Sequence, residues 1–265
     1  MNDTDKHSVR ATVATTDTVI DADDAGDLAT APRGVQRQQA ARKLWRVEAV
    51  YLVALLLFAA LAFYAHADAY FAWDLFAERD LQTVSVPGFA ALMRFISVFG
   101  NGPVPIAMTT ATLLFFLWRN RRTEAAGLGF SVLGSSLLNV LLKTLIARPR
   151  PTSALVQVFR PLDTQSFPSG HVVFYVCFFG FLFFAAFAVL PKGSTARRLA
   201  LPLLALPVLL VGLSRVYLGA HWPSDTIGAY LIGGLWLALS LHFYQGWKAR
   251  STFHKGRRDQ AEATT

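Results

Sequence analysis

The sequence predicts an all-α membrane protein, a bundle of six transmembrane helices with one short interfacial helix. Of its 265 residues, 54% are hydrophobic and only 16% are charged, and the mean hydropathy is +0.39. The apolar residues come in long runs rather than at amphipathic spacing, which is typical of helices that cross a bilayer. The net charge of +8 gathers beside the ends of these runs. We therefore interpret it as a topology signal and expect no nucleic-acid partner.

The two ends of the chain predict tails outside the membrane. Residues 1–46 are polar and lack both a long apolar run and a signal-peptide pattern, so we expect a disordered cytoplasmic tail. Its last part is basic, as is typical of a segment that lies against anionic headgroups. A second basic tail, residues 247–265, follows the last apolar run. Residues 47–246 between the tails form the predicted six-span domain.

The first predicted span covers about residues 47–66, which is long enough to cross the hydrocarbon core. An acidic stretch from Asp68 to Asp80 follows it. Residues 89–99 are apolar apart from Arg94, but they are too short to span and stop at Gly100-Asn101-Gly102-Pro103. This segment predicts the interfacial helix.

Five further apolar runs predict the remaining spans. They cover about residues 104–118, 125–147, 171–190, 199–218 and 224–244. In the run 125–147, Gly127, Ser131 and Ser135 recur every four residues, which favours close helix packing over a catalytic role. The single cysteine, Cys177, lies inside an apolar run and predicts a buried apolar residue, and no intrachain disulfide is possible.

An even number of spans places both termini on one side of the membrane. Basic excess in both tails, at 119–122 and at 192–198 predicts that this side is cytoplasmic. We expect a bacterial inner membrane, with an intracellular eukaryotic membrane as the alternative. The opposite side receives the segments 148–170 and 214–225, which nevertheless contain arginines against the charge rule. These arginines indicate anion binding, and they are Arg148, Arg150, Arg160 and Arg215.

Two of the segments on that side carry cations and a helix start. Lys143 lies near the end of a span, with Arg148 and Arg150 just beyond it. These side chains either snorkel to the interface or bind an anion. The segment from Pro168 to His171 predicts a helix start at which Ser169 caps the first turn and free amides bind an anion. An ordinary cap beside an interfacial histidine is the alternative.

The third segment runs from Ser214 to Asp225. His221 precedes a helix start, and Asp225 lies about one turn into that helix, within reach of the imidazole. A carboxylate on one ring nitrogen fixes the tautomer and leaves a lone pair on the other, as a nucleophilic histidine requires. Alone, this pair is also typical of a helix cap. Together, the three segments place cations, an anion-binding helix start and two histidines on one side, which predicts phosphoryl transfer.

These residues resemble the type 2 phosphatidic acid phosphatase family, the lipid phosphate phosphatases, which share their site with vanadium-dependent haloperoxidases. The pattern K-x6-R-P matches Lys143, Arg150 and Pro151, and P-S-G-H matches Pro168 to His171. S-R-x5-H-x3-D matches the third segment at four positions, which are Ser214, Arg215, His221 and Asp225. No motif position departs from the family pattern, and the resemblance covers roughly residues 50–245.

The resemblance implies a role for each matched residue. Three cations and the helix start hold the phosphate; they are Lys143, Arg150, Arg215, Ser169 and Gly170. His221 is the implied nucleophile, which forms a phosphohistidine, and Asp225 orients it. His171 is the implied acid that protonates the leaving alkoxide and later activates water. Arg148, which the pattern does not require, is at most auxiliary.

The motifs contain no metal-binding carboxylate cluster, so we predict a metal-independent enzyme without a cofactor. Its predicted partners are membrane lipids and a lipid phosphate substrate, with oligomeric state left open. Candidate substrates are a polyprenyl diphosphate, phosphatidylglycerophosphate, phosphatidic acid and a phosphorylated lipid A. Two alternatives are a vanadate-dependent haloperoxidase, a class that is typically soluble, and a non-enzymatic transporter or lipid-binding protein that uses the same cations. The other histidines receive no role; they are His7, His66, His242 and His254.

Overall fold

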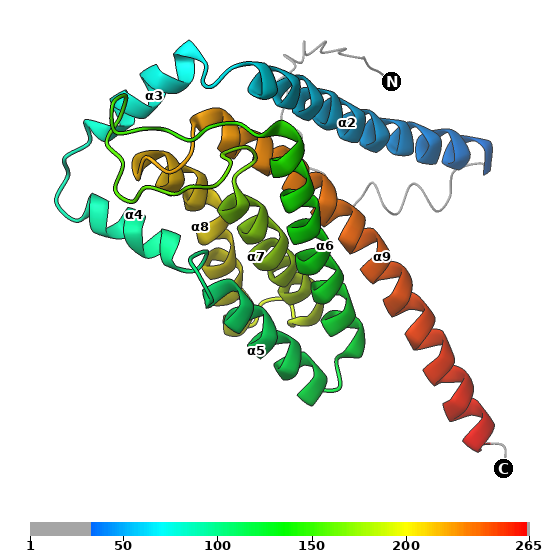
Figure 1. Cartoon of the computed structure of the whole chain (residues 1–265). Helices are drawn as coiled ribbons and strands as arrows, with labels where there is room; N and C mark the ends of the chain where they lie inside the picture. The colour runs from blue at the N-terminus through cyan, green and yellow to red at the C-terminus, as the bar shows by residue number, and fades with distance from the viewer. Residues whose placement is uncertain (1–32, 264–265) are drawn as a thin grey trace, which may run out of the picture. The chain divides into compact units, whose positions relative to one another are not determined.

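The computed structural model describes the backbone of residues 33–263 and the side chains of residues 48–250. Within that part of the chain every regular element is a helix (Figure 1). In order they are α2 (Arg33–Ala67), α3 (Ala72–Gln82), α4 (Phe89–Val98), α5 (Val104–Trp118), α6 (Arg122–Ile146), α7 (Gly170–Val189), α8 (Thr195–Tyr217) and α9 (Pro223–Ala263). The predicted all-α class is confirmed for these residues.

Five of the described helices contain a segment long and apolar enough to cross a membrane. These segments are Glu48–Ala67, Arg122–Ile146, Gly170–Val189, Thr195–Tyr217 and Pro223–Arg250. The sixth predicted span corresponds to α5, which has only 15 residues and would rise about 22 Å, less than a typical hydrocarbon core. The predicted interfacial helix corresponds to α4, which has 10 residues, and its interfacial position stays a prediction. The structure therefore supports a membrane protein with five candidate spans, and the sixth span stays a prediction.

Helices extend into both predicted tails in the described part of the chain. Helix α2 begins at Arg33 and so includes residues 33–46 of the predicted N-terminal tail, whose remaining residues 1–32 lie outside the described residues. Helix α9 continues to Ala263 through most of the predicted C-terminal tail. The physical reason is that both segments are rich in Ala, Arg, Gln and Lys, which extend a helix that an adjoining span has already nucleated.

The acidic stretch after the first span also folds as a helix. In α3 the Asp74 side chain accepts a hydrogen bond from the Phe71 N–H at 3.1 Å, which satisfies one of the free amides at the helix start. Asp74 and Glu78 both face inward and are fully buried. The sequence showed only that this stretch is acidic, and the structure places two of its carboxylates in the protein interior.

Helix α7 lies at the centre of the bundle and packs against α6, α8 and α9 (Figure 1). Its phenylalanine-rich surface is buried over most of its length. The small residues of α6 face it: the Ser131 hydroxyl donates to the Cys177 carbonyl at 3.0 Å. A Cβ atom on Gly127 would come within 2.7 Å of the Phe181 ring. The close approach of α6 and α7 thus depends on that stripe of small residues.

The end of α6, the start of α7, the end of α8 and the start of α9 are joined by two loops, residues 147–169 and 218–222. The loops pack tightly on each other at Gly219, which has φ of +66°. A Cβ atom there would come within 2.0 Å of the Gln157 carbonyl oxygen, so only glycine fits. Helix α4 braces α8 from the side, because the Ser214 hydroxyl donates to the Met93 carbonyl at 2.6 Å. These contacts fix the helix ends that carry the predicted site.

Candidate active site

His221 lies in the short loop before α9 and is almost fully buried. Its Nε2 is 3.1 Å from Nη1 of Arg150, and its Nδ1 is 3.5 Å from Oδ2 of Asp225. A guanidinium only donates hydrogen bonds, so Nε2 carries the lone pair and Nδ1 carries the proton. Burial and the positive charges of Arg150, Lys143 and Arg215 hold the pKa of His221 well below its usual value. The imidazole is therefore neutral at pH 7, with its lone pair toward Arg150.

Asp225 is fixed by hydrogen bonds to both carboxylate oxygens. Oδ1 accepts from Arg148 at 2.7 Å. Oδ2 accepts from the Ser166 hydroxyl and from the Trp222 N–H, the latter at 2.9 Å. Ser166 Oγ is also 3.4 Å from Nδ1 of His221. This arrangement holds the carboxylate beside the Nδ1 of His221, as the sequence predicted for the pair.

Arg148 differs from the predicted auxiliary anion ligand. Its side chain is fully buried and forms salt bridges with Asp225 at 2.7 Å and Asp74 at 2.9 Å. It also donates to the Ser224 hydroxyl at 2.6 Å and lies over the Phe71 ring, 4.7 Å from the centroid. Both terminal nitrogens of the guanidinium are thus paired within the protein. Arg148 neutralises two buried carboxylates and holds Asp225, and it does not face a phosphate.

The sequence missed three residues of this buried network, namely Asp74, Ser166 and Ser224. Asp74 also accepts from the Ser224 N–H at 2.8 Å and from the Ser224 hydroxyl at 2.7 Å, which ties α3 to the first turn of α9. The one available signal was an acidic stretch on the same predicted side as unexplained arginines. Nothing in the spacing of these residues specified which acid would pair with which arginine.

Lys143 and Arg150 point toward the loop beside His221. Lys143 Nζ donates to the Gln165 carbonyl at 2.5 Å and to the Ser166 carbonyl at 3.1 Å. Arg150 donates from Nη1 to the Ala220 carbonyl at 2.6 Å and from Nε to the Thr164 carbonyl at 2.7 Å. Burial lowers the pKa of Arg150, with Asp225 acting in the opposite direction. Of the two predicted phosphate ligands, Arg150 therefore lies on the lone-pair side of His221, and Lys143 lies against the loop that carries Ser166.

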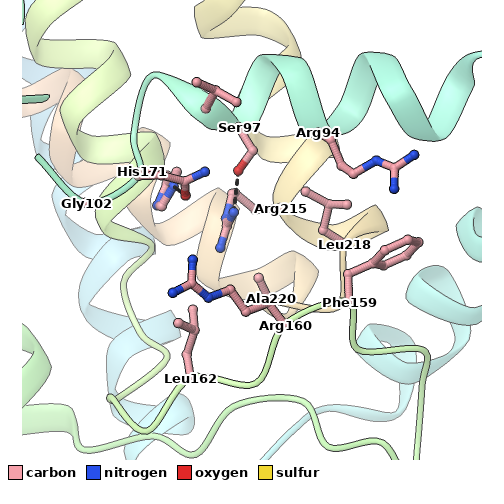
Figure 2. A pocket seen from close by; sticks show the side chains of 12 residues that line it. Arg94, Ser97, Gly102, Phe159, Arg160, Leu162, His171, Arg215, Leu218 and Ala220 are labelled. Carbon is pink, nitrogen blue, oxygen red and sulfur yellow. Dashed lines mark hydrogen bonds between the residues drawn. The ribbon is translucent and has the colours of Figure 1, made fainter. Parts of the chain in front are cut away.

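Arg215 comes from the last turn of α8 and is almost fully buried. One Nη atom donates to the Ser97 hydroxyl of α4 (Figure 2). Its Nε has no hydrogen-bond partner among the described residues. A buried guanidinium donor without a partner is costly, and an anion placed beside it would satisfy it.

The start of α7 differs in one detail from the prediction. Ser169 occupies the N-cap position, but its side chain makes no capping hydrogen bond, and its buried Oγ has no partner among the described side chains and backbone. Its backbone N–H donates instead to the Asp225 carbonyl at 3.2 Å. Gly170 follows it, and a Cβ atom there would lie 3.1 Å from Oδ1 of Asn139. The hydroxyl and the first-turn amides are thus left for an anion.

His171 lies in the first turn of α7, and its Nε2 is 2.9 Å from Oδ1 of Asn101. Gly100 covers the ring, because a Cβ atom there would come within 2.3 Å of Cδ2 of His171. The sequence treated Gly100 and Asn101 only as a helix stop. The structure shows that the turn between α4 and α5 holds the second histidine of the site.

A cavity of about 520 Å³ opens beside His171 and Arg215 (Figure 2). Its lining includes Ser97, Asn101 and Ala220, so it adjoins the residues that hold Arg215, His171 and Arg150. Lys143, Arg150, His221 and Asp225 do not line it. The cavity therefore lies on the His171 side of the site.

Among the side chains that the structure describes, no group of three or more His, Cys, Asp or Glu is placed to hold a metal ion. Asp225 and Asp74 use their oxygens on Arg148, Ser166 and Ser224 instead. The positive charge at the site comes from three protein cations, Lys143, Arg150 and Arg215. Whether the reaction runs without metal stays a prediction, and a chelator tests it.

The site combines a buried neutral histidine, an oriented carboxylate, three cations and a second histidine, which are groups that phosphoryl transfer requires. The model of the PAP2 superfamily matches residues 124–249, which contain all three motifs. Phosphatidylglycerophosphatase B of Bacillus subtilis is 29% identical over 184 residues, covering 67% of this chain and 86% of that protein. Decaprenylphosphoryl-5-phosphoribose phosphatase of Mycobacterium tuberculosis is 31% identical, covering 57% of this chain and 77% of that protein.

A solved structure shares the fold. The transmembrane PAP2-type phosphatidylglycerolphosphate phosphatase from Bacillus subtilis matches with a TM-score of 0.65 at 23% identity, over 74% of this chain and 96% of that chain. The chain belongs to the PAP2 superfamily, and it is a phosphatase, a phosphoric monoester hydrolase. The resemblance found from the motifs is thereby confirmed. An enzyme is supported over the non-enzymatic transporter or binding protein considered from the sequence.

Proposed function

We propose that this protein removes a phosphate from a membrane lipid through a phosphohistidine on His221, without a metal ion. The observation that carries the proposal is that the two ring nitrogens of His221 face different partners. Nδ1 faces Asp225, and the lone pair on Nε2 faces Arg150 at 3.1 Å. A phosphate held by Arg150 is therefore presented to the nucleophilic nitrogen.

In the first step the Nε2 lone pair of His221 forms a bond to phosphorus, and the bond from phosphorus to the leaving-group oxygen breaks. His171 gives a proton to that oxygen. Asp225 stays ionised beside the protonated Nδ1 and stabilises the positive charge that develops on the ring. Arg150, Lys143 and Arg215 neutralise the phosphoryl oxygens, which is the main requirement of a loose phosphoryl transition state.

In the second step a water molecule attacks phosphorus and gives its proton to His171. The bond between phosphorus and His221 breaks, which restores the lone pair on Nε2 and frees inorganic phosphate. His171 thus returns to its starting protonation state over the complete cycle. The free hydroxyl of Ser169 and the start of α7 add donors to the bound phosphate.

The substrate class follows from where the site lies. All the proposed ligands lie at helix ends or in the loop just beyond one, where a headgroup would meet the ends of membrane spans. Relatives named for phosphatidylglycerophosphate and for a decaprenylphosphoryl sugar phosphate support a lipid substrate. We place this face on the non-cytoplasmic side of a bacterial inner membrane and both termini in the cytoplasm, because the basic segments favour that orientation.

The test uses the purified full chain in detergent, with chelator present and a panel of lipid phosphates and diphosphates. We expect phosphate release by the wild type and at least a hundredfold loss in His221→Ala. Rapid acid-free quenching with a labelled phosphoryl donor should detect a phosphoenzyme in the wild type only. Retained release in His221→Ala would overturn the nucleophile, and loss on chelation with recovery on added Mg²⁺ would overturn the metal-free reaction.

A further inference from the structure

Two arginines outside the three motifs line the cavity beside His171 and Arg215. Arg94 comes from α4, and Arg160 comes from the loop between α6 and α7. In Figure 2 the guanidinium of Arg160 lies on the same side of the cavity as that of Arg215, whereas the Arg94 side chain points away from both. Within the described residues neither Arg94 nor Arg160 has a hydrogen bond or a salt bridge.

The charge of this cavity is unbalanced. Its lining contains three arginines and a histidine but no aspartate or glutamate. Like charges that share a concave, partly apolar site repel each other more strongly than the same charges in open water. Arg160 is exposed, and it is therefore placed to contact an anion that enters the cavity.

The position of the cavity identifies which part of the substrate enters it. In an in-line transfer the nucleophile and the leaving group lie on opposite sides of phosphorus. His171, the proposed acid for the leaving group, lines the cavity, while the nucleophile His221 does not. This step rests on the proposed function. It places the leaving group in the cavity, against Phe159, Leu162 and Leu218 for its apolar part.

We propose that the leaving group carries a second phosphate, and that Arg160 binds it. A neutral alcohol leaving group would need the proton from His171 but no further cation. A second phosphate next to the scissile bond, as in a diphosphate, or a few bonds away, as in a phosphodiester, would meet Arg160 through charge-assisted hydrogen bonds. The preferred substrates are thus lipids with two phosphates, ahead of simple monophosphates such as phosphatidic acid.

The experiment compares two matched pairs of substrates with the purified full chain. One pair is a polyprenyl diphosphate and the monophosphate of the same chain. The other pair is phosphatidylglycerophosphate and phosphatidic acid with the same acyl groups. In each pair the leaving group of the first substrate retains a phosphate, and that of the second does not. We expect Arg160→Gln to lower kcat/KM roughly tenfold for the first substrate and to change it less than twofold for the second. The pair that responds identifies a diphosphate or a phosphodiester as the second anion.

Two further variants control the result. Arg160→Lys keeps the charge without the fork-shaped donors and should recover part of the lost discrimination. Arg198→Gln removes the same charge from an exposed position near the start of α8, about 25 Å along the helix from Arg215, and should leave both pairs unchanged.

An equal effect of Arg160→Gln on both members of each pair, or no effect on either, overturns the second-phosphate site while leaving the phosphatase intact. Release from no lipid by the wild type overturns the proposed function itself, and the inference with it.

Discussion

Nε2 of His171 on α7 lies 2.9 Å from Oδ1 of Asn101, in the turn between α4 and α5. An amide oxygen only accepts, so this contact places a proton on Nε2 and fixes the orientation of the ring. Gly100 in the same turn leaves space for the ring. A turn that is distant in sequence from every motif therefore positions the proposed acid of the reaction.

Asn101→Ala removes the acceptor for His171, and we expect kcat to fall roughly tenfold on a lipid phosphate whose alkoxide needs protonation. A substrate with a good leaving group, such as p-nitrophenyl phosphate, needs little protonation and should lose much less. The ratio of the two rates is the measurement. An equal loss on both substrates would indicate that Asn101 only supports the fold, and Asn101→Asp, which keeps an acceptor oxygen, should retain most of the lipid activity.

Arg148 and Arg150 are two residues apart but have different surroundings, which predicts opposite phenotypes. Arg148→Gln leaves Asp74 and Asp225 without their buried cation, so we expect a loss of about 3–5 kcal/mol in the free energy of unfolding. Arg150→Gln removes a cation that contacts only loop groups and His221, so activity should fall at least tenfold with little change in stability. Thermal unfolding in detergent and phosphate release measure the two quantities. Equal melting temperatures for the two variants would contradict the assigned roles.

The low pKa of His221 sets the acidic limit of the reaction. His221 of the wild type should remain neutral at pH 6.5. Its protonation should therefore cause no drop in kcat/KM near this pH. Arg150→Gln removes one of the positive charges that lower this pKa. The acidic limb of the plot of kcat/KM against pH should therefore move to higher pH. Wild type and variant are compared on the same substrate, so the ionisation of the substrate cancels. A limb that stays in place, or that moves to lower pH, would count against a neutral His221 beside Arg150.

Glu78 predicts a dependence of stability on pH. Burial raises the pKa of its carboxyl to about 9, assisted by the negative charges of Asp225 and Asp74, and neither oxygen has a hydrogen-bond partner among the described residues. Above pH 4.5 the unfolded chain releases the proton while the folded protein retains it, so stability falls as pH rises toward 9. The slope is about 1.4 kcal/mol per pH unit over this range.

Glu78→Gln resembles the protonated carboxyl and should remove that slope. We expect the melting temperature of the variant in detergent to decline less between pH 5 and pH 8 than that of the wild type. Phosphate release at pH 7 should be unchanged, because Glu78 is already neutral there. The same pH dependence in both proteins would show that Glu78 is ionised in the folded state.

Many residues of the candidate site could be predicted because they lie in short motifs beside predicted helix ends. The long apolar runs place helix ends, and Lys143, Ser169, Arg215 and Asp225 each lie within a turn of such an end. Residues that are anchored to a helix end come together once the helices pack side by side. The prediction of a membrane span at residues 104–118 had weaker support. Helix α5 is shorter than a membrane core, and apolar composition alone does not decide whether it spans.

The sequence by itself determined the helical class, the main membrane segments, the three motifs and the phosphatase family, because hydrophobic runs and local spacing express them directly. Tertiary structure alone decided that Arg148 neutralises Asp74 and Asp225, that Asn101 holds His171, and that Arg160 faces the cavity. Each of these is a pairing between segments that are far apart in the chain. Charge and hydrogen-bonding groups show that a buried side chain needs a partner, but only the packing of α3, α4 and the loop before α7 decides which partner it meets.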